Sequence, residues 1–326
     1  MEEYNIKSKV VGVDISNERT TYAIVDVRGN ILAEDFFPTQ DYPDVNNFVT
    51  AISEKIVMLV EANGGYETIR SIGVSCPSAS SVSGCIENAA NLPWKGIVPL
   101  AAMLRDRMGL AVALANDAHI TALGEYTFGS AHGMNNFIIV SLGVGIGSCF
   151  FSKGNEHCGH LGFAGEFGHT CIVEKGRKCG CGHEGCLEAY VGANGIIQTA
   201  HELMAESDAP SLMRNLEKLS PRTIAESCDQ GDEMAIEVYR RTGYYLGLGV
   251  ANYASIVDPE AIILTGGVSH AGKWLLDPLY DTFEAHVFGN LRGRVKILCS
   301  KLNDRERDVL GASALAWSVP EYSLFK

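Results

Sequence analysis

The sequence predicts an α/β protein with two domains and an internally duplicated architecture. Its 326 residues are more than one hydrophobic core usually holds. Short apolar runs that indicate strands alternate with segments of helical periodicity, and this alternation is typical of α/β layers. A strand, a loop and a returning strand open each half of the chain, which indicates that one unit is repeated.

The first half begins with a predicted three-stranded meander. Its strands are expected at 9–15, 22–27 and 31–34, with a turn at 28–30. Residues 44–63 have apolar side chains at helical spacing and end at Gly64-Gly65, a common helix stop. The other elements expected here are a strand at 69–75, a helix at 98–108, a strand at 111–115 and a helix that starts at Asn116-Asp117.

The second half repeats this opening. A strand at 136–142 and a returning strand at 148–151 flank a glycine-rich turn, Gly143-Val-Gly-Ile-Gly147. The later elements are helices at 187–205 and 233–256, a strand at 261–264, a helix after Gly266-Gly267, a strand at 294–299 and a helix at 308–318. We expect a smaller domain of residues 1–125, joined by the C-terminal helix of about 308–326, and a larger domain of residues 126–307.

Composition and charge favour a protein of the reduced cytoplasm. Hydrophobic residues make up 46% of the chain and charged residues 20%, as in ordinary globular proteins. The net charge of −13, without a cluster of Lys and Arg, argues against a nucleic-acid partner but not against ATP. The N-terminus has no apolar signal segment and no run reaches about 18 apolar residues, so we expect neither secretion nor a membrane partner. The ten cysteines are not spaced like a disulfide framework.

The most specific feature is a cluster of cysteines and glycines, Cys179-Gly-Cys181-Gly-His-Glu-Gly-Cys186. A Cys-x-Cys pair rarely closes a disulfide because the ring is strained. The interleaved glycines let the backbone fold tightly around a point, as three thiolates on a tetrahedral zinc require. We expect His169 as the fourth ligand, with the alternatives His157, His160, Cys171 and His183. Such a full set of ligands makes the zinc structural, whereas clustered or reactive thiols without a metal are the other interpretation.

The cysteine cluster and the residues before it form one long signature. Glu166-Phe-Gly-His169, followed by the segment from Cys179 to Glu188, matches every fixed position of a pattern in the ROK family, whose members include bacterial glucokinases and other hexose kinases. Asn91-Leu-Pro-Trp94, Asn116-Asp117-Ala and Leu264-Thr-Gly-Gly-Val-Ser269 resemble further segments of that family. The resemblance extends from about Val10 to Trp317. It implies a two-domain, actin-like ATPase fold (ribonuclease H-like) with a cleft between the domains where sugar and ATP meet.

The resemblance also implies that Asp117 is the catalytic base of a sugar kinase. An alcohol is a poor nucleophile, and a carboxylate at hydrogen-bond distance orients it and accepts its proton during phosphoryl transfer. The same position at the start of a helix is that of a simple N-cap. The dipeptide alone favours the cap, whereas the surrounding signature favours the catalytic role, which is the one expected here.

Polar residues near these motifs resemble the family's ligands for sugar hydroxyls. They are Asn91, Asn116, Asp117, Glu166, His169 and Glu188. Carboxylates and amides suit vicinal diols because each oxygen or nitrogen makes a directed hydrogen bond. His169 would bind zinc through one ring nitrogen and face the sugar with the other. The alternatives are a solvated helix face for the two glutamates and a turn before a proline for Asn91.

The loops expected to hold the ATP phosphates depart from the family pattern. Where the family has Gly-Gly-Thr after an aspartate, this chain has Asp14-Ile-Ser16-Asn17-Glu18-Arg19-Thr20, whose side chains crowd the backbone. The second loop keeps the glycines of Gly-Thr-Gly-x-Gly but has Val144 in place of the hydroxyl. The expected nucleotide contacts are Asp14 for Mg²⁺, Arg19, Thr20 or Ser16 in place of the lost donors, Gly143, Gly145 and Gly147, and Gly266 and Gly267 on the adenosine side.

The expected function is transfer of the ATP γ-phosphoryl group to a hexose, with the 6-hydroxyl of glucose favoured. N-acetylglucosamine, N-acetylmannosamine, fructose and allose fit the same signature. The altered phosphate loops leave a sugar sensor or pseudo-kinase as the alternative. A transcription regulator is disfavoured because fewer than ten residues precede the first predicted strand and the charge is acidic. A homodimer, common in the family, is expected.

Overall fold

The computed structural model describes residues 7–89, 91–160, 164–303 and 306–319 of the chain. Contacts between residues divide the chain into two units: unit 1 is Met1–Gly133 with Lys301–Lys326, and unit 2 is Met134–Ser300. The boundaries expected from the sequence lie at 125 and 307. One unbroken helix, α3 (Asp117–Phe128), spans residue 125, so the division between the units follows the end of that helix.

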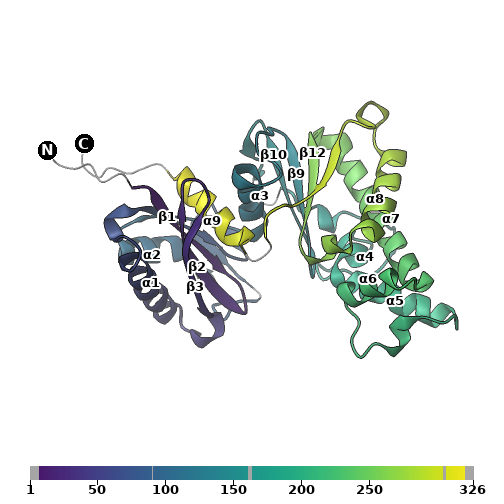
Figure 1. Cartoon of the computed structure of the whole chain (residues 1–326), viewed down its shortest axis with the longest axis horizontal. Coiled ribbons are helices and arrows are strands. Elements are labelled where there is room, and N and C mark those ends of the chain that lie inside the picture. Colours follow the sequence, from purple (N-terminus) through teal and green to yellow (C-terminus); the bar gives the residue numbers. More distant parts are fainter. Residues whose placement is uncertain (1–6, 90, 161–163, 304–305, 320–326) are drawn as a thin grey trace. The chain divides into compact units, whose positions relative to one another are not determined.

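A five-stranded sheet forms the centre of unit 1 (Figure 1). Its strands are β1 (Lys9–Ile15), β2 (Arg19–Asp26), β3 (Ile31–Pro38), β4 (Ile69–Ser75) and β8 (Ala111–Ala115). Their order is β3-β2-β1-β4-β8, with an antiparallel meander from β1 to β3 and parallel pairing of β1 with β4 and of β4 with β8. All five predicted strands of the first half are confirmed, and β3 is longer than expected.

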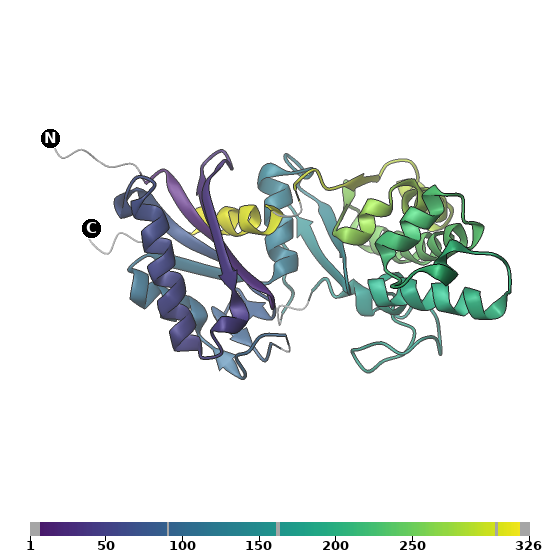
Figure 2. The same ribbon diagram turned by 60° about the horizontal axis from the view of Figure 1, so that its bottom comes forward.

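Helices cover both faces of this sheet (Figure 2). Successive side chains of β1 point to opposite faces, as in any strand. Val11 packs in a core with α1 (Val45–Glu61) and α2 (Leu100–Met108), whereas Val10 packs against α9 (Arg307–Ser318). The approach of α9 is so close that a β-carbon on Gly12 would lie 2.4 Å from the carbonyl oxygen of Val309. Glycine at this position therefore allows the C-terminal helix to lie directly on β1.

The five-stranded sheet of unit 2 has the same topology as the sheet of unit 1. Its strands are β9 (Phe137–Leu142), β10 (Ile146–Ser152), β11 (Asn155–Glu156), β12 (Ala261–Thr265) and β13 (Lys296–Cys299), in the order β11-β10-β9-β12-β13. β9 pairs antiparallel with β10 and parallel with β12, and β12 pairs parallel with β13. An antiparallel hairpin followed by two parallel strands thus recurs in both units. The predicted duplicated α/β architecture is confirmed.

Five α-helices are described in unit 2: α4 (Glu188–Val191), α5 (Ala193–Glu206), α6 (Pro221–Asp229), α7 (Glu233–Val257) and α8 (Lys273–His286). The helix predicted at 187–205 is divided into α4 and α5 at Gly192, whose backbone is extended. The helix α6 was not predicted, although Ser220 and Thr223 form a capping box and Pro221 occupies its first turn.

Several short elements were also missed because they are too short to show periodicity. A small sheet consists of β5 (Ala79–Ser80), β6 (Cys85–Glu87) and β7 (Ile97–Val98). The 3₁₀ helices are η1 (Thr39–Asp41), η2 (Tyr66–Thr68), η3 (Phe167–His169), η4 (Leu212–Asn215), η5 (Gly267–Ala271) and η6 (Gly289–Leu291).

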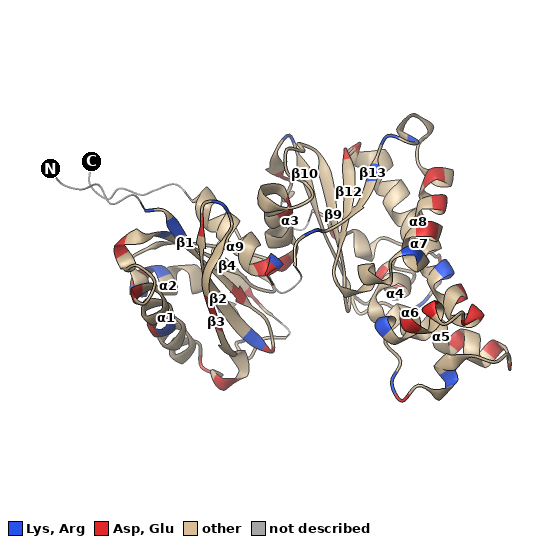
Figure 3. Ribbon diagram, viewed as in Figure 1, with Lys and Arg blue, Asp and Glu red and all other residues tan. Residues whose placement is uncertain are grey.

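Charge is spread over both units, and acidic positions recur along the helices of unit 2 (Figure 3). Examples are Glu226 and Asp229 of α6 and Asp277, Asp281 and Glu284 of α8. Among the residues that the structure describes, none of the helices combines the length and the apolar character needed to cross a bilayer.

Candidate active site

The carboxyl ends of the three parallel strands of unit 1 bring predicted site residues to one edge of the sheet. The register pairs Asp14 with Ser75, and Ser75 with Ala115. The next residue after β4, Cys76, donates its N–H to the carbonyl of Ala115 at 3.1 Å. Because Asn116 follows Ala115 directly, Asp14 and the Asn-Asp pair lie at the same edge.

Asn116 is the N-cap of α3. Its backbone is extended, and its side-chain oxygen accepts a hydrogen bond from the His119 N–H at 2.9 Å. Asp117 is the first residue of the helix, where the helix dipole favours a carboxylate. The Asp117 side chain is exposed, and its Oδ1 accepts from the adjacent Ala118 N–H at 2.9 Å. The capping role considered for Asp117 thus belongs to Asn116.

Negative charge is concentrated at this edge. The pKa of Asp14 is raised to about 7, first by burial and next by the nearby carboxylate of Asp308 on α9. The Ser75 hydroxyl and Arg19 oppose this shift, and Asp117 adds to it. A group with such a raised pKa in acidic surroundings gains from a nearby cation, which stabilises its ionised form.

A thiol lies beside these carboxyl groups. Cys76 is fully buried. Burial, with Asp14 and Asp117 nearby, raises the pKa of its thiol. Cys76 is therefore a neutral packing residue rather than a nucleophile.

The turn between β1 and β2 is closed by its own polar groups. Ser16 accepts the N–H of Arg19 at 3.2 Å and donates its hydroxyl to the carbonyl of Arg19 at 2.9 Å. The guanidinium of Arg19 lies 5.7 Å from the ring centre of Phe36. Thr20 is fully buried, and its hydroxyl is 2.9 Å from that of Thr39. The structure therefore does not present Thr20 to a ligand, while Arg19 remains exposed.

Asn91 is exposed in a turn between two buried anchors, Leu92 and Trp94. The indole N–H of Trp94 donates to the carbonyl of Tyr42 at 3.0 Å, which fixes the turn to the core of unit 1. Asn91 is thus an exposed residue of a turn that is anchored in the core. This position agrees both with a sugar ligand and with a simple turn residue before Pro93.

In unit 2 the glycine-rich turn lies at the carboxyl end of β9. Gly143 donates its N–H to the carbonyl of Gly145 at 3.0 Å, and its own carbonyl accepts the N–H of Ala193 at 2.9 Å. Val144, at the predicted hydroxyl position, is 76% exposed. Gly147 is part of β10 rather than of the turn, because the strand starts at Ile146.

The second glycine pair lies at the carboxyl end of β12, the neighbour of β9. Gly266 has φ +84°, and a β-carbon there would lie 2.5 Å from the carbonyl oxygen of Leu142. Glycine is therefore required twice over, by the backbone conformation and by the close approach. The strand order thus brings the Gly266-Gly267 pair beside the turn at 143–145.

A pocket of about 560 Å³ opens beside both glycine turns. It is lined by Gly143, Ala193, Ser220, Pro221, Arg222, Ala225, Glu226, Asp229, Tyr239, Gly267, Val268, His270 and Ala271. The two glycines in this set were predicted from the sequence, but the polar side chains of Arg222, Glu226, Asp229 and His270 were not. The start signal of α6 at Ser220 could have indicated most of them.

His169 and the three clustered cysteines converge in unit 2. One possible ligand atom from each of His169, Cys179, Cys181 and Cys186 lies within 4.8 Å of the others. The Nδ1 of His169 is 3.6 Å from the Cys179 Sγ, and the Sγ atoms of Cys181 and Cys186 are 3.6 Å apart. A zinc ion with bonds of about 2.0–2.3 Å requires ligand separations of about 3.6–3.8 Å in a tetrahedron. The four residues therefore fit zinc.

The alternatives to His169 do not belong to this group. His157, His160, Cys171 and His183 are absent from the convergent set among the described residues. The backbone carbonyl of His183 instead accepts the N–H of Cys179 at 2.8 Å.

Two carboxylates flank the cluster. The Nε2 of His169 is 3.9 Å from the Glu166 Oε2, so the two ring nitrogens face the cysteines and Glu166 respectively. The Glu188 Oε1 is 3.6 Å from the Cys179 Sγ, and its Oε2 accepts the Ile146 N–H at 2.9 Å. Glu166 is exposed and Glu188 half-buried. The structure thus assembles Glu166, His169 and Glu188 beside the turn at 143–145.

The chain is similar to known proteins over nearly its whole length. A model of the ROK family matches residues 10–319. The glucokinase of Streptomyces coelicolor is 32% identical over 315 residues, which are 94% of this chain and 96% of that protein. The xylose repressor of Caldicellulosiruptor bescii is 27% identical over 322 residues, 96% of this chain and 80% of the repressor. The solved ROK family glucokinase from Streptomyces griseus, in complex with glucose and AMPPNP, has a TM-score of 0.74 and 29% identity, covering 95% of this chain and 100% of that chain.

Proposed function

The chain belongs to the ROK family and is an ATP-dependent hexose kinase with the actin-like ATPase fold, and we propose that its acceptor is the 6-hydroxyl of glucose. Two relatives support glucose over other hexoses: the Streptomyces coelicolor protein is a glucokinase, and the Streptomyces griseus glucokinase was solved with glucose and AMPPNP. We further propose that the protein acts in the cytoplasm and as a homodimer.

The proposed general base is Asp117. The observation that carries this assignment is that Asn116 caps α3, which leaves the Asp117 carboxylate exposed at the edge of the sheet. During transfer the sugar oxygen forms a bond to the γ-phosphorus, the bond between that phosphorus and the leaving ADP oxygen breaks, and the hydroxyl proton passes to Asp117. Positioning of the hydroxyl and removal of its proton are the two contributions that a carboxylate makes here.

Glu166, His169 and Glu188 are the proposed ligands of the sugar hydroxyls in unit 2, and Asn91 and Asn116 in unit 1. The exposed carboxylate of Glu166 and the Nε2 of His169 both have room to meet a diol. Asn116 uses its oxygen for the helix cap, so its NH₂ group is the part that would donate to the sugar.

The pocket beside the two glycine turns is the proposed site of the nucleoside of ATP. Gly143 and Gly267 would let the backbone approach the nucleotide closely, because a β-carbon at either position would meet no protein atom within 4 Å, and Gly145 and Gly266 are the further backbone contacts proposed for it. Arg19 is the proposed cationic side chain near the phosphates. Asp14 is the proposed residue for Mg²⁺, and its carboxyl, in acidic surroundings, suits this ion. When bound, magnesium would neutralise charge on the phosphates.

We propose that His169, Cys179, Cys181 and Cys186 hold a structural zinc. With all four positions taken by protein, the ion would stabilise the fold of the loop rather than activate a ligand. His169 would then be fixed in orientation, with its Nε2 beside Glu166.

An ADP-release assay over glucose, N-acetylglucosamine, N-acetylmannosamine, fructose and allose tests the proposal. We expect the highest kcat/KM with glucose, and about a 10²–10⁴-fold lower kcat for Asp117→Asn. Calorimetry should show that this variant still binds glucose. If Asp117→Asn turned over glucose as fast as the wild-type protein, Asp117 would not be the general base. A higher kcat/KM for another hexose would show that glucose is not the preferred substrate.

A second candidate function is that of a sugar sensor that does not transfer phosphate. Two observations favour it: Val144 replaces a hydroxyl in the phosphate turn, and the relatives include xylose repressors. Glucose binding by calorimetry without turnover of any hexose would support the sensor and contradict the kinase.

A further inference from the structure

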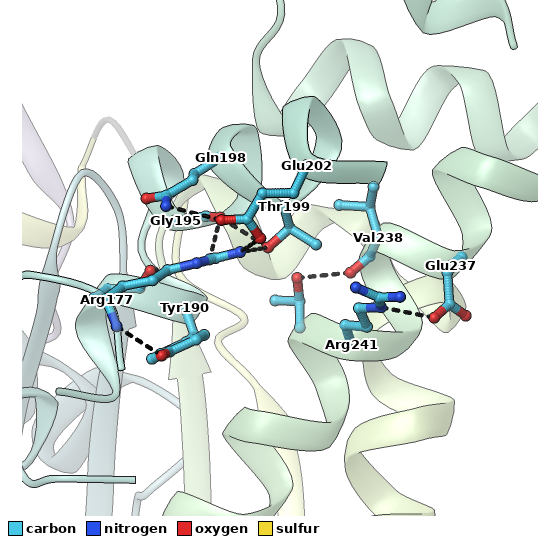
Figure 4. Close-up of polar contacts among 11 residues, drawn as sticks. Arg177, Tyr190, Gly195, Gln198, Thr199, Glu202, Glu237, Val238 and Arg241 are labelled. Carbon is cyan, nitrogen blue, oxygen red and sulfur yellow. Dashed lines mark hydrogen bonds and ion pairs between the residues drawn. The ribbon is translucent and has the colours of Figure 1, made fainter. Parts of the chain in front are cut away.

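Arg177 lies two residues before the first cysteine of the cluster, and its side chain is only 12% exposed. Its guanidinium donates to the carbonyls of Ala189 at 3.2 Å and Gly195 at 3.0 Å, to the hydroxyl of Thr199 at 2.9 Å and to the carboxylate of Glu202 (Figure 4). These acceptors belong to α4 and α5. One side chain therefore ties two helices to the segment that enters the cysteine cluster.

Tyr190 of α4 holds the same residue from a second side. Its ring centre lies 4.7 Å from the guanidinium carbon of Arg177, and its hydroxyl accepts the backbone N–H of Arg177 at 2.9 Å. A β-carbon on Gly176 would lie 2.1 Å from that hydroxyl, so the backbone approaches as closely as a glycine permits. Both the main chain and the side chain of Arg177 are thus fixed to α4.

The junction between α4 and α5 carries groups of the proposed active site. Glu188 is the first residue of α4, and its Oε2 accepts the N–H of Ile146. Ala193 is the first residue of α5, and its N–H donates to the carbonyl of Gly143. A β-carbon on Gly192, between the helices, would lie 2.7 Å from the carbonyl oxygen of Val144. The positions of the turn at 143–145 and of Glu188 therefore depend on this junction.

We propose that Arg177 is a positioning residue for the kinase reaction: it fixes the α4–α5 junction and, through it, both Glu188 and the glycine turn at 143–145. The proposal rests on the proposed function of these groups. A planar guanidinium with five N–H donors can serve four acceptors on two helices at once. A lysine ammonium at the same position is a point charge and would reach only part of this set.

The test compares Arg177→Lys and Arg177→Met with the wild-type protein. We expect kcat/KM to fall about 10- to 100-fold in Arg177→Met, with higher KM for both glucose and ATP, because small displacements of positioning groups are costly. Arg177→Lys should recover part of the loss. Calorimetry with glucose and with AMPPNP should show weaker binding of both ligands by the Met variant. Variants with a lower melting temperature but unchanged kcat, KM and dissociation constants would reduce Arg177 to a purely structural role and overturn the proposal.

Arg241 provides the matched control. Its Nε pairs with Glu237 at 2.8 Å within α7, and it acts on Glu202 through its charge, whereas Arg177 binds α4 and α5 by hydrogen bonds (Figure 4). Arg241→Gln should therefore leave kcat and KM within about twofold of the wild-type values. Equal losses in the Arg241 and Arg177 variants would also overturn the proposal. If the wild-type protein shows no turnover, the kinase function fails, whereas the calorimetric comparison still decides whether Arg177 positions the binding groups.

Discussion

Glu188 accepts a hydrogen bond from the backbone N–H of Ile146 at 2.9 Å, so a proposed sugar ligand is attached to the turn proposed for the phosphates. The same side chain lies close to glycine: a β-carbon on Gly145 would be 2.4 Å from its Oε2. The carboxylate thus holds the end of the turn, in addition to its proposed role as a sugar ligand. Substitutions at this position can separate the two roles.

Glu188→Gln keeps an oxygen that can accept from Ile146 but removes the charge. We expect about a tenfold or larger rise in KM for glucose and little change in KM for ATP, since hydrogen bonds to charged groups are worth about 1.5–3 kcal/mol. Glu188→Ala removes the acceptor as well, so KM for ATP should also rise. Steady-state kinetics with each substrate varied in turn gives both constants. Identical KM values for ATP in the two variants would show that the bond to Ile146 does not support the nucleotide site.

Asn116 and Asp117 should differ in their effect on stability. Asn116→Ala removes the cap of α3 and should lower the free energy of unfolding by about 0.5–2 kcal/mol. Asp117→Asn leaves that cap in place and should change the free energy by no more than about 0.5 kcal/mol. Urea unfolding of both variants measures the difference. A larger stability loss for Asp117→Asn would indicate that the carboxylate is a structural group after all.

The His/Cys cluster should retain zinc through purification under reducing conditions. We expect about one zinc per chain by elemental mass spectrometry, and a lower melting temperature after treatment with a chelator. Cys181→Ser should lose most of the metal, because a hydroxyl is a poor zinc ligand. Cys85→Ser is the control, since Cys85 lies in the small sheet of unit 1 and its thiol contacts the Ser83 carbonyl. Equal zinc contents in the two variants would contradict the metal assignment.

Asp232 should make the stability of unit 2 depend on pH. It caps α7 through the N–H groups of Met234 and Ala235, and its other oxygen accepts from Ser211 and Leu212. Burial raises the pKa of its carboxyl, but these hydrogen bonds outweigh burial and hold the pKa below the ordinary 3.8. A lowered folded-state pKa means that this contribution is complete above about pH 4–5 and is lost as the pH falls through the folded value.

Asp232→Asn is the informative variant, because asparagine caps a helix without a titrating group. Between pH 5 and about pH 3 the wild-type protein should lose more free energy of unfolding than the variant does. Asp232→Ala should cost about 1–2 kcal/mol at pH 7. Urea titrations at several pH values test all three proteins, and parallel pH profiles for wild type and Asp232→Asn would contradict the assignment.

Most of the fold could be predicted because its strands are short apolar runs separated by turns. The order of the strands within each sheet could not be predicted, because strands that are far apart in the sequence, such as β1 and β4 or β9 and β12, pair with each other. Gly192 divides a predicted helix because its extended backbone faces the carbonyl of Val144, a tertiary contact. The helix α6 was missed although its capping box is visible in the sequence, because Ile224, Ser227 and Cys228 are its only buried residues and so few positions give no clear apolar periodicity.

The site could be predicted where its residues lie close together in the sequence. It could not be predicted where contacts between distant segments decide the position of a side chain. His169 and the three cysteines converge as their spacing indicates. Thr20 differs, because the register of β1 with β2 directs its hydroxyl to Thr39 inside the core. The role of Arg177 could not be read from the sequence, since its acceptors come from helices whose arrangement only the structure gives.

The closeness of α9 to β1, enforced at Gly12, has a consequence for the order of events during synthesis. Strands made first on the ribosome lack one covering layer until residues 307–318 emerge, after all of unit 2 has been translated. Apolar residues such as Val10 and Val25 stay uncovered on that face in the meantime. Unit 2, which is continuous in sequence, can complete its own core earlier, so nascent chains that stall before residue 307 should be prone to aggregation through the first sheet.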